Sequence, residues 1–205
     1  MSKPIPLQPG GYYHIFNRGV NRCNLFREPR NYLHFLKLYT QHIDPIAETY
    51  AYCLMRNHFH VFVRIKPMVV NAAFSEIHRP APSQSFSNLF NAYTKAMNQV
   101  FGRTGSLFEH PFHRIAVTSD AYFTRLIAYI HSNPQKHGFV DDFHDWPYSS
   151  YGAMLSEKPT RLQRKQVLDW FEGAKYFVAA HNHYRADFEV PGATDDDTNS
   201  DPSDP

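Results

Sequence analysis

Two histidines separated by one residue, His58 and His60, could together bind a metal ion. They begin an alternating segment, 58–65, which predicts a β-strand with both imidazoles on one face, about 7 Å apart at their Cα atoms. The other face of this strand is apolar throughout: Phe59, Val61, Val63 and Ile65. Two imidazoles at this spacing can converge on one divalent cation. A pair of half-exposed strand histidines fits the same pattern, so both interpretations stay open.

A tyrosine and an asparagine four residues apart, Tyr129 and Asn133, lie in a predicted helix that begins near Ser119 and ends before Pro134. Its apolar face is formed by Phe123, Leu126, Ile127 and Ile130, and Tyr129 and Asn133 lie on an adjacent stripe. If that stripe faces the histidine strand, a metal held by the two histidines and the Asn133 oxygen would lie near a phenol. Such a site could attack a phosphodiester and form a covalent phosphotyrosine. Alternatively, Tyr129 is an aromatic at the margin of the core with a solvated hydroxyl.

The elements that must position these residues can be predicted from their periodicity. We expect strands near 12–17, 48–54, 58–65 and 114–117, helices beginning near 29, 83 and 119, and one or two further helices within 162–184. This order predicts an α+β fold, an antiparallel sheet with helices packed on one face, followed by a C-terminal helical extension. We divide the chain into a catalytic domain over 1–155, the extension over 156–188 and a tail over 189–205.

The net charge of +2 conceals an uneven distribution. All 21 basic residues but only 13 of the 19 acidic residues lie before residue 189, so this part has a net charge of +8. The tail has six acidic residues and few apolar ones, a composition typical of disorder. The cationic part suits a polyanionic partner such as nucleic acid, although ordinary solubility charge explains the same balance.

The sequence also argues against several classes of protein. It has no apolar run of the roughly 18–20 residues that span a bilayer, and its N-terminus has no apolar signal core. Its two cysteines, Cys23 and Cys53, are too few for a disulfide framework and suit a reducing compartment. We therefore expect a cytoplasmic protein without a membrane segment.

Seven segments occur in an order that resembles the single-tyrosine HUH transposases of the IS200-like family, and within it most closely the REP-associated tyrosine transposases. They are YHIFNRG at 13–19, LF at 25–26, MRNHFH at 55–60, SLF at 106–108, YIHSNP at 129–134, KHG at 136–138 and DWPYSSY at 145–151. Each segment is unspecific alone. The ordered set is specific, above all the helical tyrosine and asparagine placed well after the histidine pair.

This resemblance implies a ferredoxin-like, RRM-like fold and a DNA transposase that cleaves and rejoins single-stranded DNA. It implies His58, His60 and Asn133 as ligands of Mg²⁺ or Mn²⁺, and Tyr129 as the nucleophile that forms a 5′-phosphotyrosine and frees a 3′-OH. It also implies recognition of a DNA hairpin and a bacterial source. Members of the family include monomers and dimers, so the oligomeric state stays open. The sequence departs from the family at Pro111, where a basic residue is common.

Four arginines are candidate contacts to DNA: Arg18, Arg22, Arg27 and Arg64. The first three follow the first strand in a basic loop, and Arg64 shares the histidine face of its strand. We interpret these arginines as contacts to phosphates or base edges, and the alternative is a solvated loop with ordinary surface arginines.

A different class of function is a non-catalytic, RRM-like protein that binds single-stranded nucleic acid by stacking bases on aromatic strands. That class predicts binding without a metal and no covalent adduct. A two-histidine phosphoesterase needs a second histidine motif of the HxS/T type, which the sequence lacks.

Overall fold

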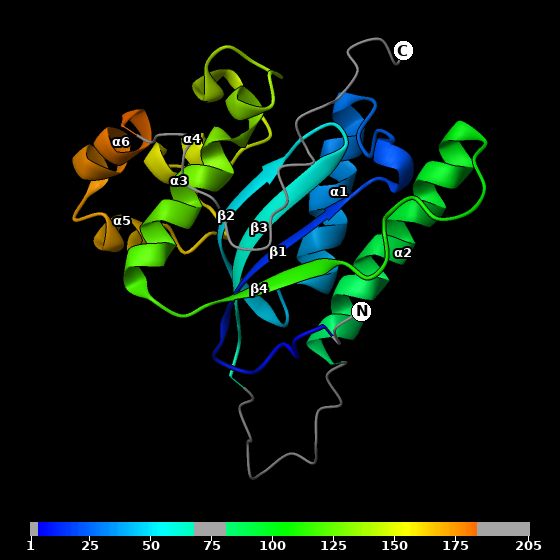
Figure 1. The fold of residues 1–205 in the computed structure, drawn as a ribbon, viewed down its shortest axis with the longest axis horizontal. Helices are drawn as coiled ribbons and strands as arrows, with labels where there is room; N and C mark the ends of the chain where they lie inside the picture. Colours follow the sequence, from blue (N-terminus) through cyan, green and yellow to red (C-terminus); the bar gives the residue numbers. More distant parts are fainter. Residues whose placement is uncertain (1–3, 68–80, 184–205) are drawn as a thin grey trace.

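The computed structural model describes residues 4–67 and 81–183, and within them a four-stranded antiparallel sheet. The strands are β1 (Tyr12–Arg18), β2 (Ala47–Leu54), β3 (His58–Ile65) and β4 (His113–Val117). Their order across the sheet is β2-β3-β1-β4, so β1 and β3 are central (Figure 1). This is the strand order of the ferredoxin-like fold. The predicted α+β class and antiparallel sheet are therefore confirmed.

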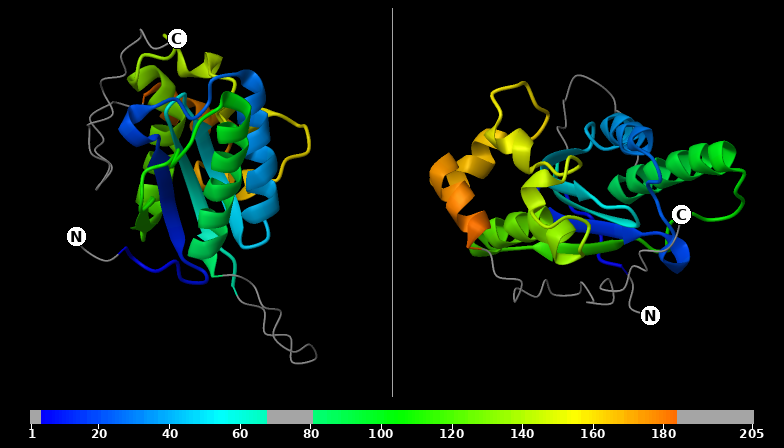
Figure 2. Two further views of the ribbon diagram at one scale, coloured as in Figure 1. Left: turned by 90° about the vertical axis from the view of Figure 1, so that its right-hand side faces the viewer. Right: turned by 90° about the horizontal axis from the view of Figure 1, so that it is seen from above.

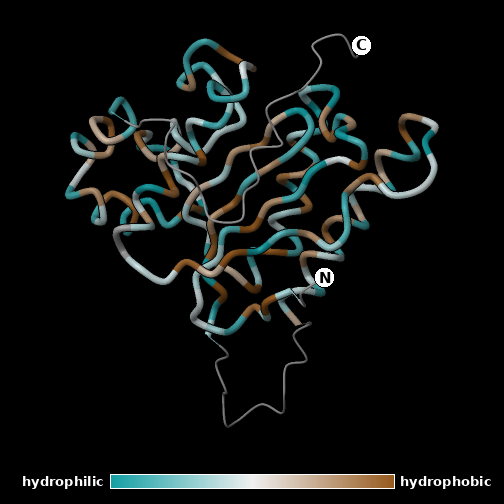
Figure 3. Tube along the Cα trace, in the orientation of Figure 1, coloured by the Kyte–Doolittle hydropathy of each residue, from teal (hydrophilic) through white to brown (hydrophobic). Residues whose placement is uncertain are grey.

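Two helices cover one face of the sheet, α1 (Pro29–His42) and α2 (Pro82–Phe101). They pack against the apolar side of β3, where Phe59, Val61 and Val63 are each at most 1% exposed. Along the strands, hydrophobic segments alternate with hydrophilic ones (Figure 3). The alternation of 58–65 thus assigned the two faces of β3 correctly.

A third long helix, α3 (Asp120–Lys136), packs on the opposite face of the sheet (Figure 2). The expectation of helices on one face holds for α1 and α2 but not for the whole chain. The histidine face also carries Phe62 and Tyr50, both fully buried, and leaving them in water would cost about 2 kcal/mol each. Phe123 and Leu126 of α3 cover them in one apolar cluster.

The helix α3 does not end before Pro134 as expected. It begins after Ser119 and continues through Pro134 to Lys136, because His137 N–H still donates to Asn133 O at 2.9 Å. Pro134 lacks the N–H that would bond to the Ile130 carbonyl, and its ring crowds that carbonyl, but the bond from His137 keeps the two following residues helical. These two residues bring His137 to the end of the helix.

The C-terminal extension adds short helices that share the α3 core. They are α5 (Arg164–Trp170) and α6 (Ala174–Asn182). The 3-10 turns η1 (Val20–Arg22) and η2 (Phe143–Asp145) and the short helix α4 (Tyr151–Leu155) precede the extension. Val167 and Phe177 are fully buried in the cluster that contains α3. The proposed acidic tail, 189–205, lies outside the described residues. Within the described part of the chain, no helix has the length and hydrophobicity of a membrane span.

Candidate active site

The histidine pair is buried on the α3 side of the sheet. His58 and His60 are 4% and 1% exposed, and their ring centroids are 5.3 Å apart with nearly perpendicular planes. The register of β1 against β3 places Arg18 opposite His58 and Phe16 opposite His60. Both histidines are therefore buried, which contradicts the alternative interpretation that they are half-exposed residues of a strand.

Each histidine has its Nδ1 engaged and its Nε2 without a hydrogen-bond partner among the described residues. The His58 Nδ1 is 2.7 Å from Asn57 Oδ1, and the His60 Nδ1 is 2.9 Å from His14 Nε2. Both Nε2 atoms are buried and unsatisfied in the described part of the chain. Histidines that bind metals use one ring nitrogen for the metal and hydrogen-bond through the other. Two orphaned Nε2 atoms on one face thus fit a divalent cation.

The protonation states also suit ligation. Burial lowers the pKa of His58 well below its ordinary value, and the neighbouring His137 and Arg18 lower it further. Burial likewise lowers the pKa of His60, with His14 and His58 acting in the same direction. Both imidazoles are therefore neutral near pH 7, the state in which histidine binds a metal.

Helix α3 brings the predicted nucleophile to this pair. The Tyr129 ring lies 5.6 Å from the His60 ring and 6.2 Å from the His14 ring, both edge to face. Tyr129 is 4% exposed, so it is a buried residue rather than a solvated one at the margin. The stripe of Tyr129 therefore faces the histidine strand, which was the condition for a site that combines a metal with a tyrosine.

Asn133 is fully buried and its side chain is already hydrogen-bonded. Its Nδ2 donates to Tyr129 O at 2.8 Å, and its Oδ1 lies 3.2 Å from His137 Nε2. The His137 ring in turn lies edge-on to His58, with 4.9 Å between centroids. An amide oxygen has two lone pairs, so Oδ1 can accept from His137 and still offer a second lone pair. Its role as third ligand stays a prediction.

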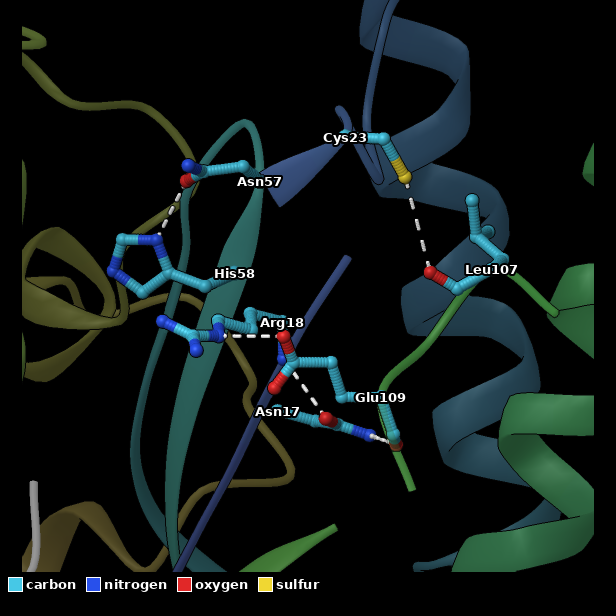
Figure 4. Close-up of polar contacts among 7 residues, drawn as sticks. All are labelled: Asn17, Arg18, Cys23, Asn57, His58, Leu107 and Glu109. Carbon is cyan, nitrogen blue, oxygen red and sulfur yellow. Dashed lines mark hydrogen bonds and ion pairs between the residues drawn. The ribbon is translucent and has the colours of Figure 1, made fainter. Parts of the chain in front are cut away.

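Arg18 lies beside His58 and is held by an ion pair (Figure 4). Its Nε is 2.8 Å from Glu109 Oε1, and both side chains are 29% exposed. Asn17 Nδ2 donates to Glu109 O at 3.1 Å, which fixes the backbone that carries this carboxylate. Of the four predicted DNA contacts, Arg18 is the one that the structure places at the histidine pair.

The other three arginines lie elsewhere. Arg22 is exposed in η1 at φ 61°, and Arg27 is exposed with its guanidinium 5.1 Å from the Phe101 ring centroid. Arg64 shares the face of His58 but lies six residues further along β3, about 20 Å away. The Arg64 Nη1 atom is 3.6 Å from Glu48 Oε2, within ion-pair distance. The structure therefore does not bring Arg64 to the histidine pair.

The site predicted from the sequence does not include four residues that the structure places there: His14, Asn57, Glu109 and His137. His14 shares the face of Phe16 and Arg18 on β1, which its alternation could have suggested. The pairing of β1 with β3, on which its contact to His60 depends, could not be read from the sequence. Glu109 precedes β4 and is far from Arg18 in the chain.

Comparisons with known proteins point to one group. A curated protein of Haemophilus influenzae, "Putative REP-associated tyrosine transposase", is 27% identical over 110 residues, which are 51% of this chain and 58% of that protein. The chain thus spans somewhat more than half the length of this relative. A solved REP-associated tyrosine transposase bound to a REP hairpin has a similar fold, with a TM-score of 0.59 and 18% identity over 78% of this chain and 89% of that one. No protein-family model matches the chain. The resemblance to REP-associated tyrosine transposases, inferred from seven short segments, is confirmed by these two similarities.

Proposed function

We propose that this protein is a DNA transposase that cleaves and rejoins single-stranded DNA next to a hairpin, with Tyr129 as the nucleophile. One observation carries the proposal. The buried His58 and His60 both present an unpartnered Nε2, in the described part of the chain, on the face where the Tyr129 ring packs against His60. The recognition of a hairpin is supported by the similar fold that was solved with a REP hairpin.

The reaction conserves the number of phosphate ester bonds. The Tyr129 Oη attacks the phosphorus, the bond from phosphorus to the 3′-oxygen breaks, and a 5′-phosphotyrosine and a free 3′-OH result. The phenol proton leaves Tyr129 and the departing 3′-oxygen gains one. Attack by a 3′-OH on the phosphotyrosine reverses these steps and reseals a strand.

A divalent cation, Mg²⁺ or Mn²⁺, would be held by His58, His60 and Asn133. When bound, it would polarise a non-bridging phosphate oxygen and orient the phosphodiester. Mixed nitrogen and oxygen ligands suit Mn²⁺ well, since imidazole is a softer ligand than the oxygens that Mg²⁺ prefers. The Arg18 guanidinium, oriented by Glu109, would contact a phosphate next to the cleaved bond.

The exposed arginines of the loop after β1, Arg22 and Arg27, would grip the hairpin through its phosphates. The net charge of +8 before residue 189 supports this interaction with a polyanion.

The non-catalytic RRM-like alternative fits the structure less well. That mode of binding needs exposed aromatic rings on the open face of the sheet. Here α3 covers that face, Phe62 is fully buried beneath it, and Phe16 stacks on His113 with 4.8 Å between centroids.

The proposal is tested by incubating the protein and Mn²⁺ with single-stranded DNA that contains the palindrome flanking its own gene. A protein–DNA adduct that resists denaturation should form and should be absent from Tyr129→Phe. Tyr122→Phe, on the same helix, is the matched control and should keep the adduct. An adduct that persists in Tyr129→Phe overturns the assignment. Metal-independent binding without any adduct supports the non-catalytic alternative.

A further inference from the structure

A third histidine, His14 of β1, is fully buried next to the pair. Its Nε2 lies 2.9 Å from His60 Nδ1, and the two rings stack with 5.0 Å between centroids and 23° between planes. This stacking leaves the His60 ring little freedom to rotate. Among the described residues, the His14 Nδ1 has no hydrogen-bond partner, so the contact to His60 is the only one that this imidazole makes through a ring nitrogen there.

The hydrogen in this contact belongs to one ring or the other, with different consequences for His60. A neutral imidazole carries one N–H. If His60 Nδ1 donates to His14, then the His60 Nε2 has a free lone pair and can bind a metal. If His14 Nε2 donates instead, then the His60 hydrogen lies on Nε2 and blocks ligation.

The other proposed ligand, His58, does not have this ambiguity. The His58 Nδ1 faces the Asn57 amide oxygen, which can only accept, so His58 must donate through Nδ1. The lone pair of His58 Nε2 is therefore available at all times. His60 equals His58 as a ligand only when His14 acts as the acceptor.

We propose that His14 is a positioning residue that accepts a hydrogen bond from His60 Nδ1 and thereby holds the His60 Nε2 lone pair ready for the metal. This inference rests on the proposed function, because it assumes that His60 is a ligand. In this arrangement the His14 Nδ1 carries a buried hydrogen without an acceptor in the described part of the chain. The opposite arrangement leaves the His60 Nε2 hydrogen without an acceptor there instead, and it is incompatible with metal binding at that atom.

The test measures Mn²⁺ affinity without DNA, by calorimetry or by the electron paramagnetic resonance of free Mn²⁺. His14→Phe keeps the ring but removes the acceptor, and it should weaken Mn²⁺ binding about 10- to 100-fold. His14→Gln, which restores an acceptor oxygen, should recover most of the affinity. His183→Phe replaces an exposed histidine whose ring contacts the Ala179 carbonyl and neither ligand, and it should bind Mn²⁺ as the wild type does. Circular dichroism checks that each variant is folded.

A second measurement does not depend on any variant. Nitrogen-15 spectra of the histidine rings with Mg²⁺ should show His60 protonated at Nδ1 and unprotonated at Nε2. A folded His14→Phe with wild-type affinity, or His60 protonated at Nε2 with metal present, overturns the role of His14. Neither result affects the adduct assay, in which only Tyr129→Phe decides the proposed nucleophile. A wild type that forms the adduct but binds no Mn²⁺ overturns the role of His14 together with the proposed metal site, and it leaves Tyr129 as the nucleophile.

Discussion

A buried hydrogen-bonded chain joins the C-terminal extension to α3, and its direction is fixed. His181 Nδ1 donates to Phe177 O at 2.7 Å, because a carbonyl can only accept. His181 Nε2 must then accept from His131 Nδ1 at 2.8 Å, and His131 Nε2 from Ser150 Oγ at 2.7 Å. A proton added to either ring would bury a charge and would force hydrogen bonds of this chain to reverse. Burial lowers the pKa of both histidines, so both are neutral near pH 7.

Acid should therefore destabilise the protein through His181. Burial lowers the pKa of His181 from 6.5 to about 4, against a smaller opposing effect of the Phe177 carbonyl. The unfolded state then binds a proton that the native state rejects, so stability falls as the pH falls from about 6.5 towards 4. For this group alone the loss is about 2 kcal/mol between pH 7 and pH 5, and about 3 kcal/mol once the pH is well below 4.

The assay is urea unfolding followed by circular dichroism at pH 7 and pH 5, for the wild type and His181→Met. At pH 7 the variant should be less stable by about 1–3 kcal/mol, because the His131 Nδ1 donor loses its acceptor. Between pH 7 and pH 5 it should lose about 2 kcal/mol less than the wild type, since it has no proton to take up at this position. His183→Met, at an exposed position after the same helix, should match the wild type in this difference. Parallel losses in the wild type and His181→Met would refute the reasoning.

Two further predictions concern the charge at the site and the packing of α3. Arg18→Ala should reduce the slope of log affinity for hairpin DNA against log salt by about one unit, since one phosphate contact is lost. Lys175→Ala, exposed on α6, is the control, and an unchanged slope for Arg18→Ala would contradict the contact. Leu126→Ala should cost about 2–5 kcal/mol in urea unfolding, because Leu126 is fully buried between α3 and the sheet. Leu33→Ala, at a side chain 65% exposed, should change stability by less than about 0.5 kcal/mol, and a similar loss in both would argue against the packing.

The parts of the site that depend on local periodicity could be predicted from the sequence. Alternation along 58–65 is a property of one strand, and it separated the two histidines from Phe59 and Val61. Helical spacing likewise placed Tyr129 and Asn133 on one stripe. Both patterns arise from the geometry of a single element, so no knowledge of its neighbours was needed.

The parts that depend on pairing between distant segments could not be predicted. The contact between His14 and His60 follows from the register of β1 on β3, and the ion pair of Arg18 joins residues 91 positions apart. Whether α3 covers the histidine face could not be decided from the sequence for a related reason. Phe62 lies on the face of β3 opposite Phe59 and Val61, so the sequence alone would place it on an exposed face. In the structure it is covered by Phe123 of α3.

The position of Tyr129 depends on both sides of α3. Residues two apart in a helix point in directions that differ by about 200°, so Tyr129 and His131 face opposite ways. Tyr129 packs against His60 of the sheet, and His131 is bonded to His181 of the extension and to Ser150. The helix α6 of the extension therefore packs against the side of α3 that lies opposite the proposed nucleophile. The phenol must come within bonding distance of a phosphorus atom. The reaction therefore requires α3 to remain packed against the sheet.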